Sequence, residues 1–525
     1  MERLRLGAFP APVLSLPEQL HDLMPRNPSR PTPRSKPPAA RRPSVPPSLR
    51  TKRDDQAIHE QPRPNHTPPD RRTNARPNHN RPFEAIEKRF ADHVAPPEVL
   101  ARSAAQIAEK VENAVLNDGR RADRSVSVEL RLRRDLATPD HLFISQAVFS
   151  LFRWRGWIEP LRFKSIEERL LFSMLLDRPT IHPACRVWAM ACGRDPSRLM
   201  PLGDAPNWPA RAEGFKRQLG GIPVTADPWR LFPDWLRDHL PLPPGGGSTK
   251  LRFVELLQVL QTRPPLWVRS QKENAETTWE EFKTLGVRPW LHRRVEHAAK
   301  LDPEVDIYHL PPFERGDLEI QDLASQAVAL VCDPDPGERW WDACAGAGGK
   351  SLHLAALMKG KGLVIATDVI EGKLKEAVRR ARRSPFRNLT TKPWDGKRIP
   401  AKLGSFDGVL VDAPCSAIGT WRRNPDARWS LDRAAISRLA GLQAEILKTA
   451  ALGVRVGGTL VYSVCTLTPP ETSAVVNGFL ESHPGFRLDP FPHPLTGEQV
   501  DGRVQIWPQD SDNDAMYIAR MVRTS

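Results

Sequence analysis

The chain has 525 residues, of which 40% are hydrophobic and 15 are tryptophan, enough for two or three folded domains. It contains no apolar run of the roughly 18 residues that a transmembrane helix needs and no signal-peptide pattern, so we expect no membrane association. Its six cysteines lack Cys-x-x-Cys spacing, which indicates neither a metal site nor a disulfide framework and favours the cytoplasm. The net charge of +15 favours a polyanionic partner, although a basic composition can also reflect the genome.

The first segment, residues 1–82, is rich in proline and in positive charge. It holds 18 prolines and 16 Lys and Arg residues against seven Asp and Glu residues. Such a composition cannot bury enough apolar surface to fold, so we predict a disordered basic tail. The tail either adds nonspecific affinity for nucleic acid or is an extension without a function.

Apolar residues then recur at helical spacing across residues 83–240, which predicts an all-α domain. Helices are predicted at 141–154, 167–176 and 184–192. The Pro-Leu-Pro-Pro-Gly-Gly-Gly run at 241–247 predicts a boundary at the end of this domain.

A small α/β subdomain is predicted next, at residues 250–320. Its predicted elements are a strand over 264–269, a helix near 278–284 and an extended segment at 307–311. Arg269 at the end of the first strand either faces a nucleic-acid phosphate or lies in solvent.

The remaining residues, 321–525, alternate between short apolar runs and helical patterns. Strands are predicted at 338–343, 363–368, 387–391, 406–412 and 458–464, and helices at 349–358, 371–383 and 432–453. This alternation predicts a doubly wound parallel α/β sheet. Residues 514–522 are expected to form a last strand, the antiparallel edge of that sheet.

A glycine-rich turn follows the first predicted strand of this sheet. The segment Trp340–Lys350 passes through three glycines into a helical pattern, an arrangement that offers backbone N–H groups to a nucleotide-like ligand. It is neither G-x-G-x-x-G nor a Walker loop, and a glycine turn can also serve packing alone. Asp368 ends the second strand, where it either binds a ribose or caps the helix beginning near Glu371.

Two further strands are each followed by a cysteine. Cys415 stands in Asp412-Ala413-Pro414-Cys415, and Cys465 stands in Tyr-Ser-Val-Cys-Thr at 462–466. Ligands of open α/β sheets bind at the carboxyl ends of strands, so both thiols are expected at the rim that carries the glycine turn. A single cysteine is more often a small core residue, but two at strand ends favour a functional interpretation.

These motifs resemble those of a known family. The segments 342–350, 412–419 and 462–466 are similar to three signature motifs of the Sun/Nop (RsmB-like) family of S-adenosylmethionine-dependent RNA cytosine-C5 methyltransferases. Two more, 419–429 and 316–326, fit in the family order, and the resemblance runs from about Pro264 to the C-terminus. It implies a Rossmann-like class I methyltransferase sheet at 321–525, an RNA-guiding subdomain at 250–320 and a helical domain at 83–240 that either binds RNA or is a general scaffold.

The resemblance also implies a mechanism with assigned residues. A thiolate adds to C6 of cytosine so that C5 can attack the sulfonium methyl of S-adenosylmethionine. Cys465 would be the nucleophile, Cys415 would assist product release, and Asp412 would hold and protonate the base at N3. The implied cofactor-binding residues are Cys344, Ala345, Gly346, Ala347, Gly348, Gly349, Lys350, Asp368, Asp395 and Asp412. Asp395 would lie near the adenine and adjacent cofactor atoms, or it is an ordinary turn residue.

The chain departs from the family in its glycine loop, which is usually Cys-Ala-Ala-Pro-Gly-Gly-Lys. Here Gly346 and Ala347 replace Ala and Pro, which raises the flexibility of the loop without removing a ligand-contacting side chain. Arg422 and Arg423 are candidates either to lower the pKa of Cys465 or to contact RNA phosphate.

We expect an active, monomeric enzyme whose substrate is ribosomal RNA of the small subunit. Two alternatives stay open, a tRNA cytosine-C5 methyltransferase and a non-catalytic RNA-binding protein of ribosome assembly. A DNA methyltransferase is disfavoured because its Glu-Asn-Val-type motif is missing.

Overall fold

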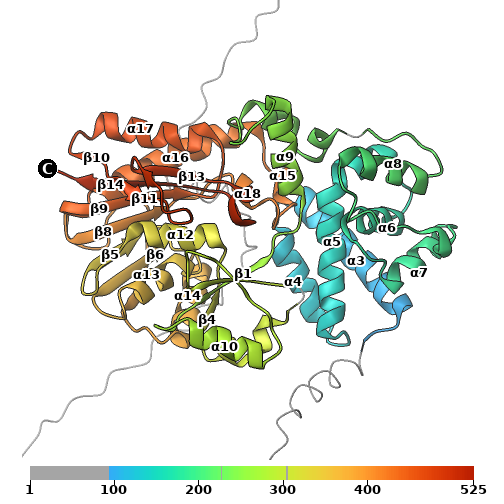
Figure 1. Ribbon diagram of the computed structural model, residues 1–525, viewed down its shortest axis with the longest axis horizontal. Helices are drawn as coiled ribbons and strands as arrows, with labels where there is room; N and C mark the ends of the chain where they lie inside the picture. The colour runs from blue at the N-terminus through green and yellow to red at the C-terminus, as the bar shows by residue number, and fades with distance from the viewer. Residues whose placement is uncertain (1–93, 226, 303–304) are drawn as a thin grey trace, which may run out of the picture. The chain divides into compact units, whose positions relative to one another are not determined.

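The computed structural model describes residues 94–525 with the exception of 226, 303 and 304. The predicted tail and the first residues of the predicted helical domain therefore lie outside the described residues. The described residues belong to one compact unit, which contains a helical part, a four-stranded sheet and a larger sheet (Figure 1). No helix among them is long and apolar enough to cross a membrane.

The helical part precedes both sheets in the chain. It consists of α3 (Pro97–Leu116), α4 (Ala122–Leu132), α5 (Thr138–Ile158), α6 (Ile166–Asp177), α7 (Pro183–Ala191), α8 (Trp208–Gln218) and α9 (Thr249–Gln261), with 3-10 turns η1 (Glu159–Leu161), η2 (Pro196–Arg198), η3 (Pro228–Leu231) and η4 (Asp234–Asp238). Helix α6 begins after Ser165, whose hydroxyl accepts a hydrogen bond from the Glu168 N–H, as an N-cap does. The three helices predicted in this part of the sequence are confirmed as α5, α6 and α7.

The four-stranded sheet has the strand order β2-β3-β1-β4 and is antiparallel. Its elements are β1 (Leu266–Ser270), α10 (Glu276–Thr284), β2 (Trp290–Leu291), β3 (Ala298–Leu301) and β4 (Leu318–Ile320). The prediction of an extended segment at 307–311 is wrong, because η5 (Ile307–His309) and α11 (Pro311–Glu314) occupy it. Pro311 starts α11 at a position where the missing N–H costs nothing.

Arg269 on β1 was predicted either to face a nucleic-acid phosphate or to lie in solvent, and both alternatives are wrong. Its side chain is neither in solvent nor available to a phosphate, because the residue is only 1% exposed. Its Nε donates to Oε1 of Gln321 at 2.8 Å. Burial, partly offset by Glu319, lowers the pKa of Arg269 to about 10.

The larger sheet has the strand order β10-β14-β9-β8-β5-β6-β7, with β13 also paired to β14. Its strands are β5 (Arg339–Asp342), β6 (Leu363–Asp368), β7 (Leu389–Pro393), β8 (Phe406–Asp412), β9 (Val454–Val464), β10 (Phe486–Leu488), β13 (Arg503–Ile506) and β14 (Met516–Arg523). The strands from β5 to β9 pair in parallel. Because β5 lies between β6 and β8, the strand order reverses at β5, which makes its carboxyl end the expected ligand site.

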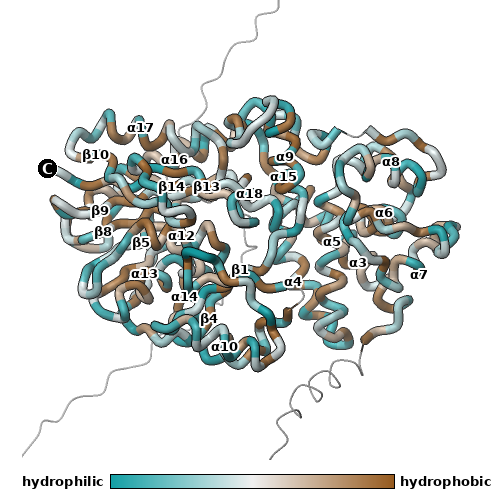
Figure 2. The backbone as a smooth tube through the Cα atoms, viewed as in Figure 1, coloured by the Kyte–Doolittle hydropathy of each residue, from teal (hydrophilic) through white to brown (hydrophobic). Residues whose placement is uncertain are grey.

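Helices cover this sheet, and β11 and β12 form a separate two-stranded ribbon. They are α12 (Leu323–Cys332), α13 (Gly349–Leu357), α14 (Glu371–Arg383), α15 (Ala427–Ser430), α16 (Arg433–Ala451), α17 (Ser473–Ser482) and α18 (Pro508–Ser511), and the ribbon is β11 (Phe491–Pro492) with β12 (Gln499–Val500). Alternate strand residues face two buried cores, with Trp341 in one and Trp340 in the other. Apolar residues accordingly run along β8 and β9 (Figure 2). The predicted doubly wound α/β fold is confirmed.

The position of the last strand was predicted wrongly. β14 runs antiparallel to β9, with Tyr517 opposite Val464, in the predicted direction. It is not the edge of the sheet, because β10 and β13 both pair with its other side. These two strands have three and four residues, too few to give an alternating pattern in the sequence.

Candidate active site

A cavity of about 490 Å³ opens at the carboxyl ends of β5, β6 and β8. Its volume suits a nucleoside-sized ligand. Most of the residues predicted for the site line it, namely Cys344, Ala345, Gly346, Ala347, Gly349, Lys350, Asp368, Asp412, Cys415 and Cys465. Gly348 and Asp395 do not. In the described part of the chain, no three His, Cys, Asp or Glu side chains are grouped as metal ligands would be.

The glycine loop presents its backbone to this cavity at the start of α13. Gly346 and Gly348 have φ of +56° and +83°, in the left-handed region that favours glycine. A Cβ at Gly348 would lie 2.9 Å from Cβ of Ala377 on α14, whereas a Cβ at Gly346 would meet no atom within 4 Å. Gly348 is therefore needed for packing, and Gly346 leaves open space for a ligand beside the N-terminus of α13.

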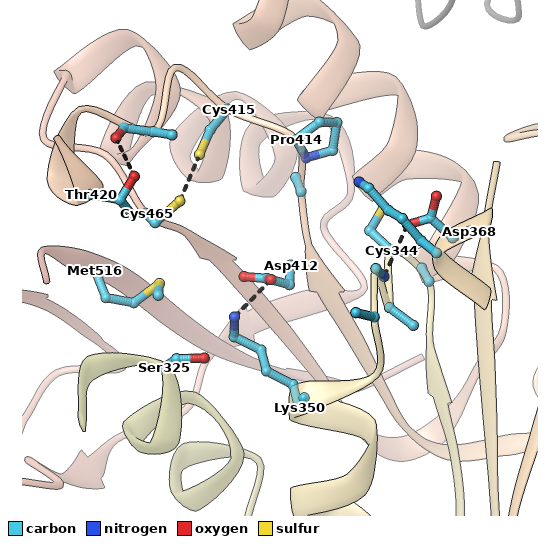
Figure 3. Close-up of a pocket in the computed structure, with 18 of the residues that line it drawn as sticks. Ser325, Cys344, Lys350, Asp368, Asp412, Pro414, Cys415, Thr420, Cys465 and Met516 are labelled. Atoms are coloured by element: carbon cyan, nitrogen blue, oxygen red, sulfur yellow. Dashed lines mark hydrogen bonds and ion pairs between the residues drawn. The ribbon is translucent and has the colours of Figure 1, made fainter. Parts of the chain in front are cut away.

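Asp368, at the end of β6, holds this loop. Its Oδ2 accepts a hydrogen bond from the Gly346 N–H at 2.9 Å (Figure 3). Its Oδ1 accepts one from the Ile370 N–H at 2.8 Å. The second contact shapes the turn before α14, but the predicted role as a helix cap is wrong, because Ile370 stands at the N-cap position of α14 and no side-chain cap hydrogen bond forms there. The carboxylate also lines the cavity, and its contact with a ribose stays a prediction.

Asp395 lies beside the cavity without lining it. Its exposed carboxylate accepts hydrogen bonds from the N–H groups of Lys397 and Arg398, chiefly the former, and these hold the pKa of Asp395 below its ordinary value. The contacts of Asp395 are those of a turn residue, and its role near the adenine stays a prediction. The neighbouring Trp394 does line the cavity and packs edge-on against Trp341, which the sequence analysis did not anticipate.

The two cysteines meet at the end of the sheet. Sγ of Cys415 lies 3.4 Å from Sγ of Cys465 (Figure 3). The hydrogen bond with Cys465, followed by burial, raises the pKa of Cys415 well above its usual value. Cys415 therefore keeps its proton at neutral pH and can donate it toward Cys465.

Lys350 and Asp412 form a charge pair in the same cavity. Nζ of Lys350 donates to Oδ2 of Asp412 at 2.7 Å, and the Ser463 hydroxyl donates to the other carboxylate oxygen at 2.8 Å. Burial opposes the charge on Lys350, but Asp412 outweighs it and, with a smaller contribution from Cys465, raises the pKa of Lys350. Lys350 therefore turns its ammonium toward Asp412, away from the backbone of the loop that carries it (Figure 3).

The roles predicted for Arg422 and Arg423 are not supported by their contacts. Arg422 is 1% exposed and donates to Oδ1 of Asp512 at 2.6 Å, so it is buried away from any RNA phosphate. Arg423 is paired with Asp322 and Asp514. The cation whose charge is coupled to Cys465 is Lys350.

A buried glutamate, Glu471, holds the segments that carry both cysteines, and the sequence analysis missed it. Its Oε1 accepts a hydrogen bond from the Ser416 N–H at 2.8 Å, and its Oε2 accepts bonds from the hydroxyls of Ser416 at 2.5 Å and Thr468 at 2.7 Å. Gln443 donates to Oε1 as well, at 3.1 Å. No local pattern separates this acid from a surface glutamate, because Ser416 and Gln443 are far away in the sequence and the nearby donors Thr466 and Thr468 are ordinary threonines.

Known proteins resemble the chain in sequence and in fold. The model of the 16S rRNA methyltransferase RsmB/F family matches residues 329–522. The ribosomal RNA small subunit methyltransferases B of Salmonella arizonae and Citrobacter koseri are each 31% identical, over 57% and 59% of this chain and 68% and 71% of theirs. The crystal structure of PH0851 is 22% identical, covers 82% of this chain and 99% of its own, and has a TM-score of 0.63, which shows a shared fold.

The reversed strand order, the cavity at the switch point and the glycine loop are those of a nucleotide-binding α/β fold, and together with the family match they define a class I α/β methyltransferase that uses S-adenosylmethionine. The chain belongs to the RsmB/F family of RNA methyltransferases, as its sequence motifs indicated.

Proposed function

We propose that this enzyme methylates C5 of a cytosine in ribosomal RNA of the small subunit, through a covalent bond between Cys465 and C6. The observation that carries the proposal is the pair of cysteine sulfurs 3.4 Å apart in the cavity that also holds the Lys350–Asp412 pair. The substrate class is supported by the names of the relatives, which are ribosomal RNA small subunit methyltransferases.

The proposed reaction starts with addition of the Cys465 thiolate to C6 of a cytosine flipped into the cavity. Asp412 hydrogen-bonds N3, and a proton from the Lys350 ammonium that is hydrogen-bonded to Asp412 passes through this carboxylate to N3, so that C5 gains the electron density of an enamine carbon. Bound S-adenosylmethionine supplies the methyl group to C5. A base then removes the C5 proton, the C6–S bond breaks so that Cys465 leaves as a thiolate, and N3 returns its proton to Asp412.

Two features support Cys465, rather than Cys415, as the nucleophile. The pKa of Cys415 is raised, so its sulfur is the protonated member of the pair. The ammonium of Lys350 lines the same cavity as Cys465 and interacts with it electrostatically. Cys415 then acts as the hydrogen-bond donor that stabilises the departing Cys465 thiolate and assists product release.

The path of the RNA is proposed to cross the four-stranded sheet. Its edge strand β2 exposes Trp290, and Arg288 and Arg293 are exposed on either side of that strand. Exposed aromatic and basic side chains together suit a single-stranded nucleic acid. Binding of RNA by the helical part stays a prediction.

Trapping of covalent adducts tests this function. The protein is incubated with S-adenosylmethionine and total RNA, and the RNA-linked protein is compared for wild type, Cys465→Ala and Cys415→Ala. We expect adducts to accumulate in Cys415→Ala and to be absent in Cys465→Ala, and sequencing of the trapped RNA separates ribosomal RNA from tRNA. The opposite dependence on the two cysteines would refute the roles assigned to Cys465 and Cys415. RNA binding without an adduct in any variant would refute the proposed enzymatic function.

A further inference from the structure

Helix α14 packs against the glycine loop through two residues one turn apart. Ala377 contacts the loop at Gly348, and Arg380 reaches the next peptide, where its Nη1 donates to the carbonyl oxygen of Ala347 at 3.0 Å. Residues three apart share a helix face, so both contacts come from the side of α14 that faces the loop. The guanidinium also lines the cavity.

The rest of the Arg380 guanidinium is held by a buried acid from the four-stranded sheet. Nε and Nη2 of Arg380 both donate to Oε2 of Glu319, at 3.0 and 2.6 Å. The Glu319 side chain is 2% exposed and stands on β4, within the family motif at 316–326 that the proposed reaction leaves without a role. Arg383 pairs with the other oxygen of Glu319 at 3.2 Å, but no hydrogen bond joins it to the loop among the described residues.

The loop needs such a restraint because of its own sequence. Gly346 and Gly348 are both left-handed and lose much conformational freedom when the loop is ordered. Proline, which would fix φ next to Gly346, is replaced here by Ala347. The loop is anchored instead on either side of the Gly346–Ala347 peptide, by Asp368 at the Gly346 N–H and by Arg380 at the Ala347 carbonyl.

We propose that Arg380, aimed by Glu319, is a positioning residue that fixes the glycine loop for S-adenosylmethionine binding in place of a proline. The inference is independent of which base the enzyme methylates. Glu319 belongs to the motif at 316–326, so the function of this motif is to fix the glycine loop through Arg380.

The test measures binding of S-adenosylmethionine by calorimetry and amide hydrogen exchange of residues 345–349 in the free protein. Loss of one charge-assisted hydrogen bond should raise the Kd about tenfold in Arg380→Ala and speed exchange in the loop. Glu319→Gln should change both quantities in the same direction by less. Arg383→Ala is the matched control, because it removes the same kind of ion pair from Glu319 without touching the loop, and its Kd should stay within about twofold of wild type.

A second variant tests whether Arg380 acts by fixing the glycine loop. The Ala347 N–H makes no hydrogen bond within the described residues, so Ala347→Pro loses no donor and should lower the Kd of Arg380→Ala back toward that of wild type. Equal weakening in Arg380→Ala and Arg383→Ala would overturn the proposal. So would a raised Kd in Arg380→Ala with unchanged exchange in the loop, since that pattern would mean a direct contact with the cofactor.

Discussion

The ammonium of Lys350 lies 2.7 Å from Oδ2 of Asp412, so a charge pair ties the first turn of α13 to the end of β8. If one residue of this pair were removed, the charge of the other would be left in the cavity without a counter-charge. The pair therefore keeps Asp412 at a fixed position relative to both cysteines and to the cofactor loop.

Substitution of Asp412 by Asn should reduce methyl transfer by about 100-fold or more, because the amide cannot supply a proton to N3. Single-turnover transfer of labelled methyl groups to RNA measures the effect. Ser463→Ala is the control, since it removes the other hydrogen bond to Asp412 and leaves the carboxylate in place. A reduction in Asp412→Asn no larger than that in Ser463→Ala would contradict the role of Asp412 as an acid.

Glu471→Gln should destabilise the protein and lower its activity together. The new NH₂ group would face donors that now bond to a carboxylate, leaving buried donors unpaired at a cost of about 2–3 kcal/mol. Urea denaturation measures the free energy of unfolding. Glu445→Gln, at an exposed position of α16, should change it by less than about 0.5 kcal/mol. Similar losses in both variants would show that Glu471 does not hold the cysteine segments.

The free energy of unfolding should depend on pH through the buried carboxyl group of Asp342. Burial raises the pKa of Asp342 to about 7, with Ser351 hydrogen-bonded to its Oδ2. The unfolded state ionises near pH 4, so between about pH 4 and 7 the folded state binds the extra proton and this residue makes stability fall as pH rises. Asp342→Asn removes that dependence, and its free energy of unfolding relative to wild type should be higher at pH 8 than at pH 5. Equal differences at the two pH values would contradict the buried, protonated state.

Arg428→Ala should cost on the order of 3 kcal/mol of stability, since a charged donor is lost from several buried acceptors. Arg428 is 1% exposed and donates to the carbonyls of Leu231 and Leu260 and to Oε1 of Gln261. Arg433→Ala is the comparison, because that side chain is 64% exposed and its pair with Asp238 is worth little. Thermal unfolding of the two variants side by side gives the difference.

The sheet was predictable from the sequence because its central strands are short apolar runs, and β5, β6 and β8 each end in an aspartate. The strands predicted at 363–368 and 406–412 match β6 and β8 residue for residue. The cluster of cysteines, Asp412 and the glycine loop was predictable for the same reason, since strand ends in a parallel sheet share one rim.

Buried arginines were not predictable, because a charged residue in a sequence is normally a surface residue. Arg269, Arg422 and Arg428 are each 1% exposed. Each is buried against acceptors brought together by the fold, and for Arg428 the Leu231 carbonyl is 197 residues away. Arg422 was considered as a contact for RNA phosphate, but the motif at 419–429 that contains it anchors the helical part.

That anchoring affects the order in which the protein can be built. Trp421 packs against Phe232 and Trp235, and Nε1 of Trp429 donates to the carbonyl of Phe152, 277 residues earlier. At a synthesis rate of ~5–20 residues per second, roughly 14–55 s separate the synthesis of Phe152 from that of Trp429, so the helical part emerges well before this portion of its core. Nascent chains arrested before Trp421 should therefore remain cleavable by protease in their helices, and those arrested well after Trp429 should become resistant.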